Sequence, residues 1–551
     1  MLRSALPTRS LAGSSSSSSK RTASHFPASL SHSSSPPPPP PASLYTQPST
    51  HTYAQQLDNP AWSDPNYLAR YRSPAHHDDR PRRGIETSAR SRPSAAPQIT
   101  STTSTSNGNG NGNGGKRIRR NRLEMEALWS GGDCSPPIPL ESYKAQTTRP
   151  KHALLFPGSG SQYVGMGHFL RKDAAANKVW EEAEDALEGF EDWRRSLRLH
   201  EMDGELGELG RMLDATEKKR GKEAQLKEVV FEGPQDELTR SSNAQPAILI
   251  TSIAFLRALE KEYGIPIAST SSLILGHSSG EYSAAVAAGA LSLKDGVRLT
   301  RLHGLLTHYA LSLPSIGLSP SPDAPPALRG QMSALVLNPG HSHAELTEVI
   351  RKIRASRPTQ QGSEGTVEVA SFNSRTQVVL AGSRDGILRA SEVLRELEIA
   401  SRAADLPVSA PFHCSFMQPA AQGMQAALTS PSIALHTPSS PLVSGLDASL
   451  ITTPSSLVAN LVAQISRPVR WSTCLASLPS QHAVSRFVFL GPGQALANLA
   501  RRDVKLLKEA EIAAGKRSKD DGEEGVPEVI SVATEKDMVQ LRERWEEEDG
   551  A

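Results

Sequence analysis

The chain has 551 residues and nearly balanced charge, with 60 Lys+Arg against 58 Asp+Glu and a formal net charge of +2. Its longest apolar stretches fall well short of the roughly 20 residues that cross a bilayer, which argues against a membrane-spanning protein. Cys134, Cys414 and Cys474 form no CxxC pair, so neither a disulfide framework nor a cysteine zinc site is indicated. We therefore expect a protein of a reducing compartment, without a metal.

The first 150 residues differ in charge from the rest. They contain 18 Lys+Arg against 9 Asp+Glu, or +9, which leaves 42 against 49, or −7, for the remainder. Residues 1–57 have no acidic residue, many serines and early arginines at Arg3 and Arg9. This composition is typical of an organellar transit peptide. We expect import into the mitochondrial matrix; the alternative is a disordered basic tail.

Low-complexity runs fill much of the segment 1–148. Serine and proline runs and an Asn-Gly repeat at 107–114 cannot bury enough apolar surface to offset the entropy of ordering. We therefore predict that this segment is disordered. The basic cluster at 116–122 has no interleaved aromatic residues and belongs to no recognisable nucleic-acid module, so we expect a solvated segment and no nucleic-acid partner.

A folded region begins at about residue 149, where the composition changes. The apolar run 152–156 is typical of a buried strand, and it ends in the glycine turn 157–162. Glycines in such a turn let the backbone approach a ligand and leave N–H groups uncovered, although a plain strand-to-helix turn explains the pattern equally well. Helical patterns follow at 174–187 and 245–263.

The main catalytic motif is a G-x-S-x-G sequence at 276–280. It lies between an apolar strand pattern at 272–275 and an alanine-rich helix pattern at 282–289. This order is that of a nucleophile elbow, in which the glycines relieve crowding and a helix N-terminus exposes the serine hydroxyl. The positive helix end also favours developing negative charge. We predict that Ser278 is a nucleophile; the alternative is a tight turn in which it only caps the helix.

A serine nucleophile needs a base to take its proton, and His413 is the candidate. It lies in a proline-bounded loop at 407–413, after an apolar strand pattern. No Asp is placed to complete a triad. If a third group orients the imidazole, we expect it to be a backbone carbonyl.

Residues 330–405 have an element order of their own, strand-helix-strand-strand-helix-strand. This order suggests a small ferredoxin-like subdomain that interrupts the larger α/β unit. The apolar and amphipathic segments that predict it are 332–337, 345–353, 367–371, 377–381, 387–397 and 399–406.

Several ordered motifs make the chain resemble the malonyl-CoA:acyl carrier protein transacylases, which also occur as acyltransferase domains of fatty acid and polyketide synthases. The resemblance runs from about 152 to 503. Residues 156–162 are similar to the family's FPGQGSQ, 245–247 to its QPA, and 276–281 to its GHSLGE. Further matching segments lie at 372–374, 408–413, 464–471 and 491–493.

The resemblance implies a fold and a reaction. The fold is an α/β-hydrolase-like large subdomain with the inserted ferredoxin-like small subdomain. We expect the large subdomain at 149–329 and 406–510 and the small subdomain at 330–405. A charged, solvated tail is expected at 511–551. The reaction is ping-pong transfer of malonyl from malonyl-CoA to the phosphopantetheine thiol of acyl carrier protein, without a cofactor. Ser278 would form the acyl-enzyme, with His413 as base and then acid. An isolated acyltransferase chain favours mitochondrial type II fatty acid synthesis.

The resemblance also implies supporting residues. The backbone carbonyl of Gln464 would orient the histidine, and the N–H groups of Ser159 and Ser279 would form the oxyanion hole. Gln245 and Asn373 fall on motifs expected to bind substrate. Because the backbone supplies the oxyanion donors, a serine at 159 in place of the family's glutamine should be tolerated.

One substrate-binding position departs from the resemblance. The family's malonyl enzymes have an arginine 25 residues after the nucleophile, which clamps the free carboxylate, and this chain has His303 there. Three explanations stay open: His303 is a weaker carboxylate ligand, Arg301 or another base reaches in, or the acyl group is not malonyl. Since Arg301 is about 200° around the expected helix, it should face elsewhere.

Two other kinds of protein remain as alternatives. A serine esterase or lipase would hydrolyse its acyl-enzyme with water, but no Asp completes the usual triad. A degenerate acyltransferase scaffold is suggested by the changes at His303 and Ser159.

Overall fold

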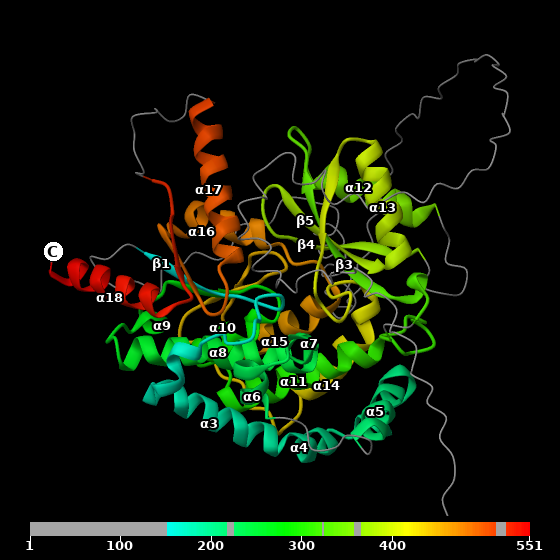
Figure 1. Cartoon of the computed structure of the whole chain (residues 1–551), viewed down its shortest axis with the longest axis horizontal. Helices are drawn as coiled ribbons and strands as arrows, with labels where there is room; N and C mark the ends of the chain where they lie inside the picture. Colours follow the sequence, from blue (N-terminus) through cyan, green and yellow to red (C-terminus); the bar gives the residue numbers. More distant parts are fainter. Residues whose placement is uncertain (1–150, 218–224, 322–323, 357–364, 514–524, 551) are drawn as a thin grey trace, which may run out of the picture. The chain divides into compact units, whose positions relative to one another are not determined.

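The computed structural model describes residues 151–217, 225–321, 324–356, 365–513 and 525–550. The expected transit peptide and disordered segment at 1–148 lie outside these residues. Two sheets organise the described chain, one of six strands and one of four (Figure 1).

The six-stranded sheet has the strand order β10-β9-β1-β2-β7-β8. Every described pairing is parallel except β7 with β8. The two central strands β1 and β2 are buried along their whole length, which explains their unbroken apolar sequences. The strands are β1 (His152–Phe156), β2 (Leu273–Gly276), β7 (Leu442–Val443), β8 (Leu450–Ile451), β9 (Arg486–Leu490) and β10 (Glu528–Val532).

Helices cover both faces of this sheet (Figure 1). Alternate side chains of β1 reach opposite cores: Leu154 and Phe156 pack with α8 and α11, whereas Ala153 and Leu155 pack with α16 and α17. The helices of the first core are α3 (Ala174–Glu188), α8 (Ser241–Lys261), α10 (Gly280–Ala287), α11 (Leu293–Ala310), α14 (Gln418–Leu428) and α15 (Pro454–Ala463); those of the second are α16 (Trp471–His482) and α17 (Ala495–Ala513).

Further helices lie between these elements in the chain. None of the described helices is long and apolar enough to span a bilayer. Other α-helices are α4 (Phe190–Ser196), α5 (Gly204–Glu217), α6 (Leu226–Glu232), α7 (Gln235–Thr239) and α9 (Ile267–Thr270). The described 3-10 helices are η3 (His168–Lys172), η4 (Leu199–Glu201), η5 (Pro326–Leu328), η6 (Ser415–Met417) and η7 (Gln464–Ser466).

The helix α8 begins four residues earlier than the sequence suggested, so that Pro246 lies inside it. Proline lacks an N–H and leaves the carbonyl four residues before it, that of Ser242, without its helical donor. Arg301 of α11 supplies the donor instead, with Nη1 2.9 Å from Ser242 O. A contact between two helices therefore makes an internal proline tolerable.

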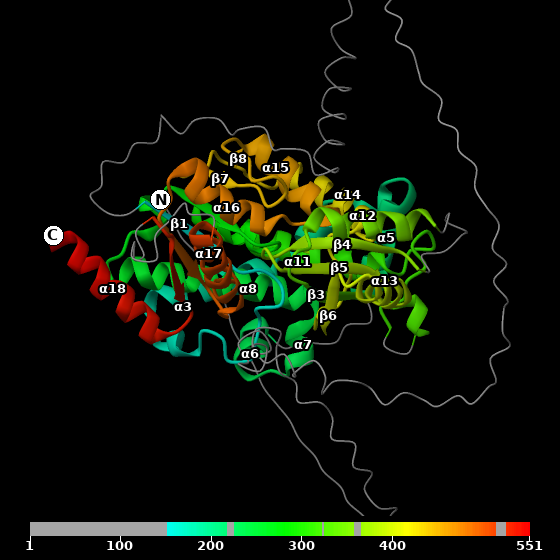
Figure 2. The same cartoon turned by 90° about the horizontal axis from the view of Figure 1, so that it is seen from above.

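The four-stranded sheet has the order β4-β5-β3-β6, and every pairing in it is antiparallel. With its two helices on one face (Figure 2), it is the predicted ferredoxin-like subdomain. Side chains of its other face, such as Ala334 and Val379, join the core of the large subdomain. The elements are β3 (Gly330–Leu337), α12 (His343–Ala355), β4 (Val367–Phe372), β5 (Gln377–Ser383), α13 (Arg384–Glu396) and β6 (Ala400–Asp405).

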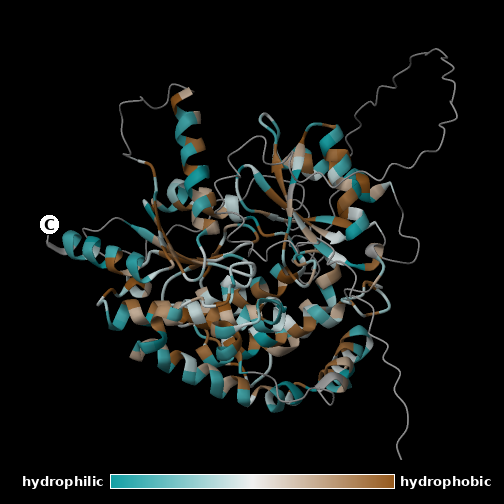
Figure 3. Cartoon of the chain, viewed as in Figure 1, coloured by the Kyte–Doolittle hydropathy of each residue, from teal (hydrophilic) through white to brown (hydrophobic). Residues whose placement is uncertain are grey.

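The solvated tail predicted for 511–551 is wrong for residues 525–550. Strand β10 pairs with β9 at the edge of the large sheet, and α18 (Glu535–Gly550) follows it. Met538, Leu541 and Trp545 of α18 are buried, at most 6% exposed. These three residues are spaced as one helix face, but many charged residues around them hide the pattern. Most of α18 is therefore drawn as hydrophilic in Figure 3.

Candidate active site

The nucleophile turn connects β2 to α10. Ser278 has a positive φ of 55°, a conformation that places a non-glycine residue under strain. A Cβ at Gly276 would lie 2.0 Å from Gly280 C, and one at Gly280 would lie 2.6 Å from Pro157 O. Only glycine therefore fits two residues before the serine and two residues after it, as the motif requires.

Ser278, His413 and Gln464 lie in one hydrogen-bonded chain. Ser278 Oγ is 2.6 Å from His413 Nε2, and His413 Nδ1 is 2.7 Å from the backbone oxygen of Gln464. A carbonyl can only accept, so Nδ1 carries the proton, and Nε2 of the neutral ring accepts from the serine hydroxyl. The arrangement can therefore remove a proton from Ser278.

Burial keeps the base neutral. His413 is 5% exposed, and desolvation lowers its pKa from 6.5 to about 4 against the opposing effect of the bond to Gln464. His413 also has a positive φ of 60°, and its N–H donates to Ile465 O at 3.2 Å. The loop backbone thus aims the ring, and the ring is ready to accept a proton at neutral pH.

Ser159 and Ser279, the two expected oxyanion donors, lie in contact. The loop after β1 rests on the nucleophile turn, where a Cβ at Gly158 would lie 2.1 Å from His277 O. The Ser159 N–H donates to Ser279 Oγ at 3.0 Å. The loop that carries Ser159 therefore reaches the residue next to the nucleophile.

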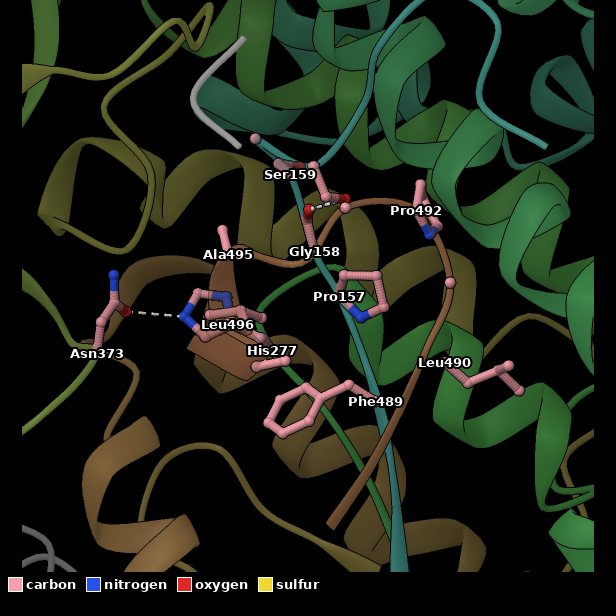
Figure 4. Close-up of a pocket in the computed structure, with 15 residues that line it drawn as sticks. Pro157, Gly158, Ser159, His277, Asn373, Phe489, Leu490, Pro492, Ala495 and Leu496 are labelled. Atoms are coloured by element: carbon pink, nitrogen blue, oxygen red, sulfur yellow. Dashed lines mark hydrogen bonds between the residues drawn. The ribbon is translucent and has the colours of Figure 1, made fainter. Parts of the chain in front are cut away.

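A cleft opens beside this loop (Figure 4). His277 and Asn373 meet in it, with His277 Nε2 2.9 Å from Asn373 Oδ1, and the ring of His277 packs edge-on against Trp471. Burial lowers the pKa of His277 to about 4, so the ring is neutral. Asn373 thus reaches the nucleophile turn from the small subdomain. The sequence reasoning did not single out His277, although it directly precedes Ser278 in the motif.

His303 is buried on α11, 4% exposed, with its ring 6.0 Å from that of Tyr282. Burial, and then the nearby His413, lower its pKa to about 3, so the ring is uncharged at neutral pH. Its Nδ1 has no hydrogen-bond partner among the described residues. His303 therefore offers a neutral ring and a free polar atom close to the base.

Arg301 faces α8, as the helix geometry predicted. Its guanidinium donates to Ser242 O and to Asn243 Oδ1. Arg301 thus donates to the Ser242 carbonyl, which has no helical N–H donor because residue 246 is proline. Its role is therefore structural, and its guanidinium lies on α8 rather than beside His413.

Gln245 is buried on α8 and 2% exposed. Its Oε1 accepts no hydrogen bond from any residue that the structure describes. The structure therefore leaves this predicted substrate residue with a free acceptor.

A buried carboxyl that the sequence reasoning passed over supports the nucleophile helix. Glu281 accepts from Gly445 N–H at 3.0 Å and from the side-chain amide of Asn460. Burial raises its pKa to about 8 in spite of these two donors. Glu281 thus connects the start of α10 by hydrogen bonds to the loop after β7 and to α15. Its place in the motif, three residues after Ser278, was the available signal.

A serine on a strand–helix turn, a histidine held by a backbone carbonyl and a ferredoxin-like insertion define an acyltransferase of the Ser-His type. The acyl transferase domain family matches residues 153–311. The chain is 33% identical over 359 residues to the malonyl CoA-acyl carrier protein transacylase of Bacillus subtilis strain 168, covering 65% of this chain and 92% of that protein. It therefore belongs to the family of malonyl-CoA:acyl carrier protein transacylases.

Other relatives agree with this assignment. The Haemophilus influenzae malonyl CoA-acyl carrier protein transacylase is 30% identical over 355 residues, covering 64% of this chain and 92% of that protein. The crystal structure of acyl-carrier-protein-S-malonyltransferase from Bartonella henselae superposes with a TM-score of 0.54 at 28% identity, covering 72% of this chain and 99% of that one. The fold class expected from the sequence is thereby confirmed.

Proposed function

We propose that the enzyme transfers a malonyl group from malonyl-CoA to the phosphopantetheine thiol of acyl carrier protein. The names of its relatives support both substrates. The observation that carries the chemistry is the 2.6 Å contact between Ser278 Oγ and His413 Nε2. No cofactor enters the proposal.

In the first half-reaction Ser278 attacks the thioester. His413 takes the hydroxyl proton as the bond from Oγ to the acyl carbon forms, and Gln464 O stabilises the resulting imidazolium. The N–H groups of Ser159 and Ser279 would stabilise the oxyanion. When the carbon–sulfur bond breaks, the proton passes from His413 to the sulfur of coenzyme A.

The second half-reaction reverses these steps with a new thiol. His413 takes the proton of the phosphopantetheine thiol, and the sulfur attacks the ester carbon of acylated Ser278. The bond to Oγ breaks and the serine recovers its proton. No water is consumed, and one thioester is exchanged for another.

For the malonyl carboxylate we propose His303 as the ligand. Arg301 is engaged on α8, while His303 Nδ1 has no partner among the described residues. A bound carboxylate would raise the pKa of His303, because a nearby negative charge favours the protonated ring. Because the buried ring of His303 is uncharged at neutral pH, a second candidate function is transfer of an uncharged acyl group.

The test uses malonyl-CoA labelled in the malonyl group. The wild-type protein should acquire label on Ser278 and pass it to phosphopantetheinylated acyl carrier protein. Carrier without phosphopantetheine is the matched control and should receive none, because it lacks the thiol. Equal labelling of Ser278→Ala, or release of the label only as free malonate, would contradict the proposal.

We further propose that the reaction serves mitochondrial type II fatty acid synthesis. The acid-free, serine- and arginine-containing segment 1–57 supports this location. Fusing this segment to a fluorescent protein should direct the fusion to mitochondria, and a variant with Arg3 and Arg9 changed to Glu should stay outside. Cytosolic fluorescence of the unaltered fusion would contradict the location and leave the chemistry untouched.

A further inference from the structure

Two serine side chains meet where the loop after β1 lies on the nucleophile turn. Ser279 Oγ accepts from the Ser159 N–H at 3.0 Å, and the two hydroxyl oxygens are 3.2 Å apart. The motifs FPGQGSQ and GHSLGE have glutamine and leucine at these positions. Both partners of this contact therefore depart from the motifs that the chain otherwise follows.

The hydroxyl of Ser279 is not used by its own helix. Ser279 is the N-cap residue of α10, where a serine side chain usually accepts from a backbone N–H of the first turn. Here its backbone is helical, with φ −57° and ψ −18°, and the side chain makes no capping bond. The residue is 4% exposed, and its oxygen is directed to the other loop.

The oxygen of Ser279 lies at the distance from the Ser159 N–H at which an oxyanion would be bound. Donors of an oxyanion hole lie about 2.7–3.1 Å from the negative oxygen, and the observed distance of 3.0 Å falls in this range. A Cβ at Gly158 would be 3.3 Å from Ser278 Cβ, which shows how closely the loop approaches the nucleophile. In the free enzyme a neutral hydroxyl thus takes the donor that the reaction needs.

We propose that Ser279 is a placeholder: its hydroxyl occupies the Ser159 N–H in the free enzyme and yields it to the thioester oxygen during acylation. The proposal rests on the proposed function, because only attack by Ser278 creates an oxyanion there. A hydroxyl attached to the chain competes for the donor more strongly than a free water, since it gives up no translational freedom. The placeholder therefore slows acylation. It does so equally for every thioester, because each presents the same carbonyl oxygen.

The variant Ser279→Ala tests this role by single-turnover acylation with malonyl-CoA and, separately, acetyl-CoA. We expect the acylation rate constant to rise about 2- to 10-fold with each thioester wild type accepts, the range of one hydrogen bond. Free coenzyme A has no acyl carbonyl, so its Kd should not change. Because Ser279→Ala loses the bond to the Ser159 N–H but no capping bond, its melting temperature should fall by no more than the loss of one hydrogen bond explains.

Ser161→Ala is the matched control. Ser161 Oγ donates to Gly158 O at 2.8 Å in the same loop, so its loss perturbs the loop without freeing the Ser159 N–H. We expect no faster acylation. An equal gain in both variants would assign the effect to loop geometry and overturn the proposal, as would unchanged or slower acylation in Ser279→Ala. If no thioester acylates wild type, the proposed function fails as well, and this is seen before any variant is compared.

Discussion

The nucleophile side of the site and the side proposed to recognise the acyl group differ in how their residues are held in place. On the nucleophile side, Ser278 and His413 have left-handed backbone conformations, and a main-chain oxygen at Gln464 completes the chain of contacts at 2.6 and 2.7 Å. On the other side, His303 and Gln245 each keep a buried polar atom without a partner among the described residues.

The difference separates the residues that carry out the reaction from those proposed to select the acyl group. The reacting groups depend on glycines and turns that many positions enforce together, so a single substitution rarely redirects them. In the proposed function, recognition of the acyl group depends on the side chain of His303. On this proposal, having histidine at 303 in place of the family's arginine would change which acyl group is transferred, while Ser278 and His413 keep their contact.

The largest effect is expected on the nucleophile side. His413→Ala should lower transfer about 10³-fold at pH 7, because a general base typically contributes this much. Steady-state transfer to the carrier measures it. Gln464→Ala is the informative partner variant: it removes a buried side chain but keeps the backbone oxygen, so transfer should fall much less. Equal losses in the two variants would show that the Gln464 side chain, and not its carbonyl, matters.

The pH dependence of acylation should show that His413 on the nucleophile side is neutral well below pH 6.5. With a pKa of about 4, His413 is roughly nine-tenths neutral at pH 5, whereas at the ordinary 6.5 it would be roughly 3% neutral, a difference of about 30-fold. We expect kcat/KM for acylation to stay near its plateau down to pH 5 and to fall below about pH 4. A midpoint near 6.5 in the folded protein would contradict the buried, neutral base.

A smaller effect is expected on the recognition side. His303→Arg should raise the ratio of malonyl to acetyl acylation about 10-fold, because an arginine adds a charged hydrogen bond to the carboxylate. His303→Ala should lower this ratio. Both ratios come from competition between the two labelled acyl-CoAs. If neither variant changes the ratio, His303 is not the ligand of the malonyl carboxylate.

The smallest effect is expected at Glu281, which holds the nucleophile helix α10, and it concerns the stability of the fold. Since burial raises its folded pKa to about 8 from 4.5, the stability from its bound proton is full below about pH 4.5 and lost as the pH rises through 8. Glu281→Gln is permanently neutral. Its melting temperature should therefore gain on wild type between pH 5 and pH 8. A constant difference over this range would mean that the carboxyl is charged in the folded protein.

Much of this fold is readable from local pattern, because short-range features determine it. Buried strands, amphipathic helices and the glycines around Ser278 follow from the spacing of residue types. Residues 525–550 were misjudged because three apolar side chains are spread among many charges. The early start of α8 depends on Arg301, which is distant in the chain, so no local pattern contains it.

The site was predictable to a similar degree. The motifs indicated Ser278 and His413, and the structure places them in contact. The bond between His277 and Asn373, and that between Ser159 and Ser279, join segments about a hundred residues apart. Such pairings arise from packing of the two subdomains and loops, which the sequence does not reveal by spacing. The roles assigned to these residues remain predictions for the experiments above.

The place of β1 in the large sheet has a consequence for the timing of synthesis. This first strand lies between β2 and β9, and His152 pairs with Arg486. More than three hundred residues must therefore be translated after β1 before its neighbour β9 exists, and the edge strand β10 comes later still. The edge of β1 that pairs with β9 therefore stays unpaired while these residues are made, and a nascent chain needs that edge protected from aggregation until then.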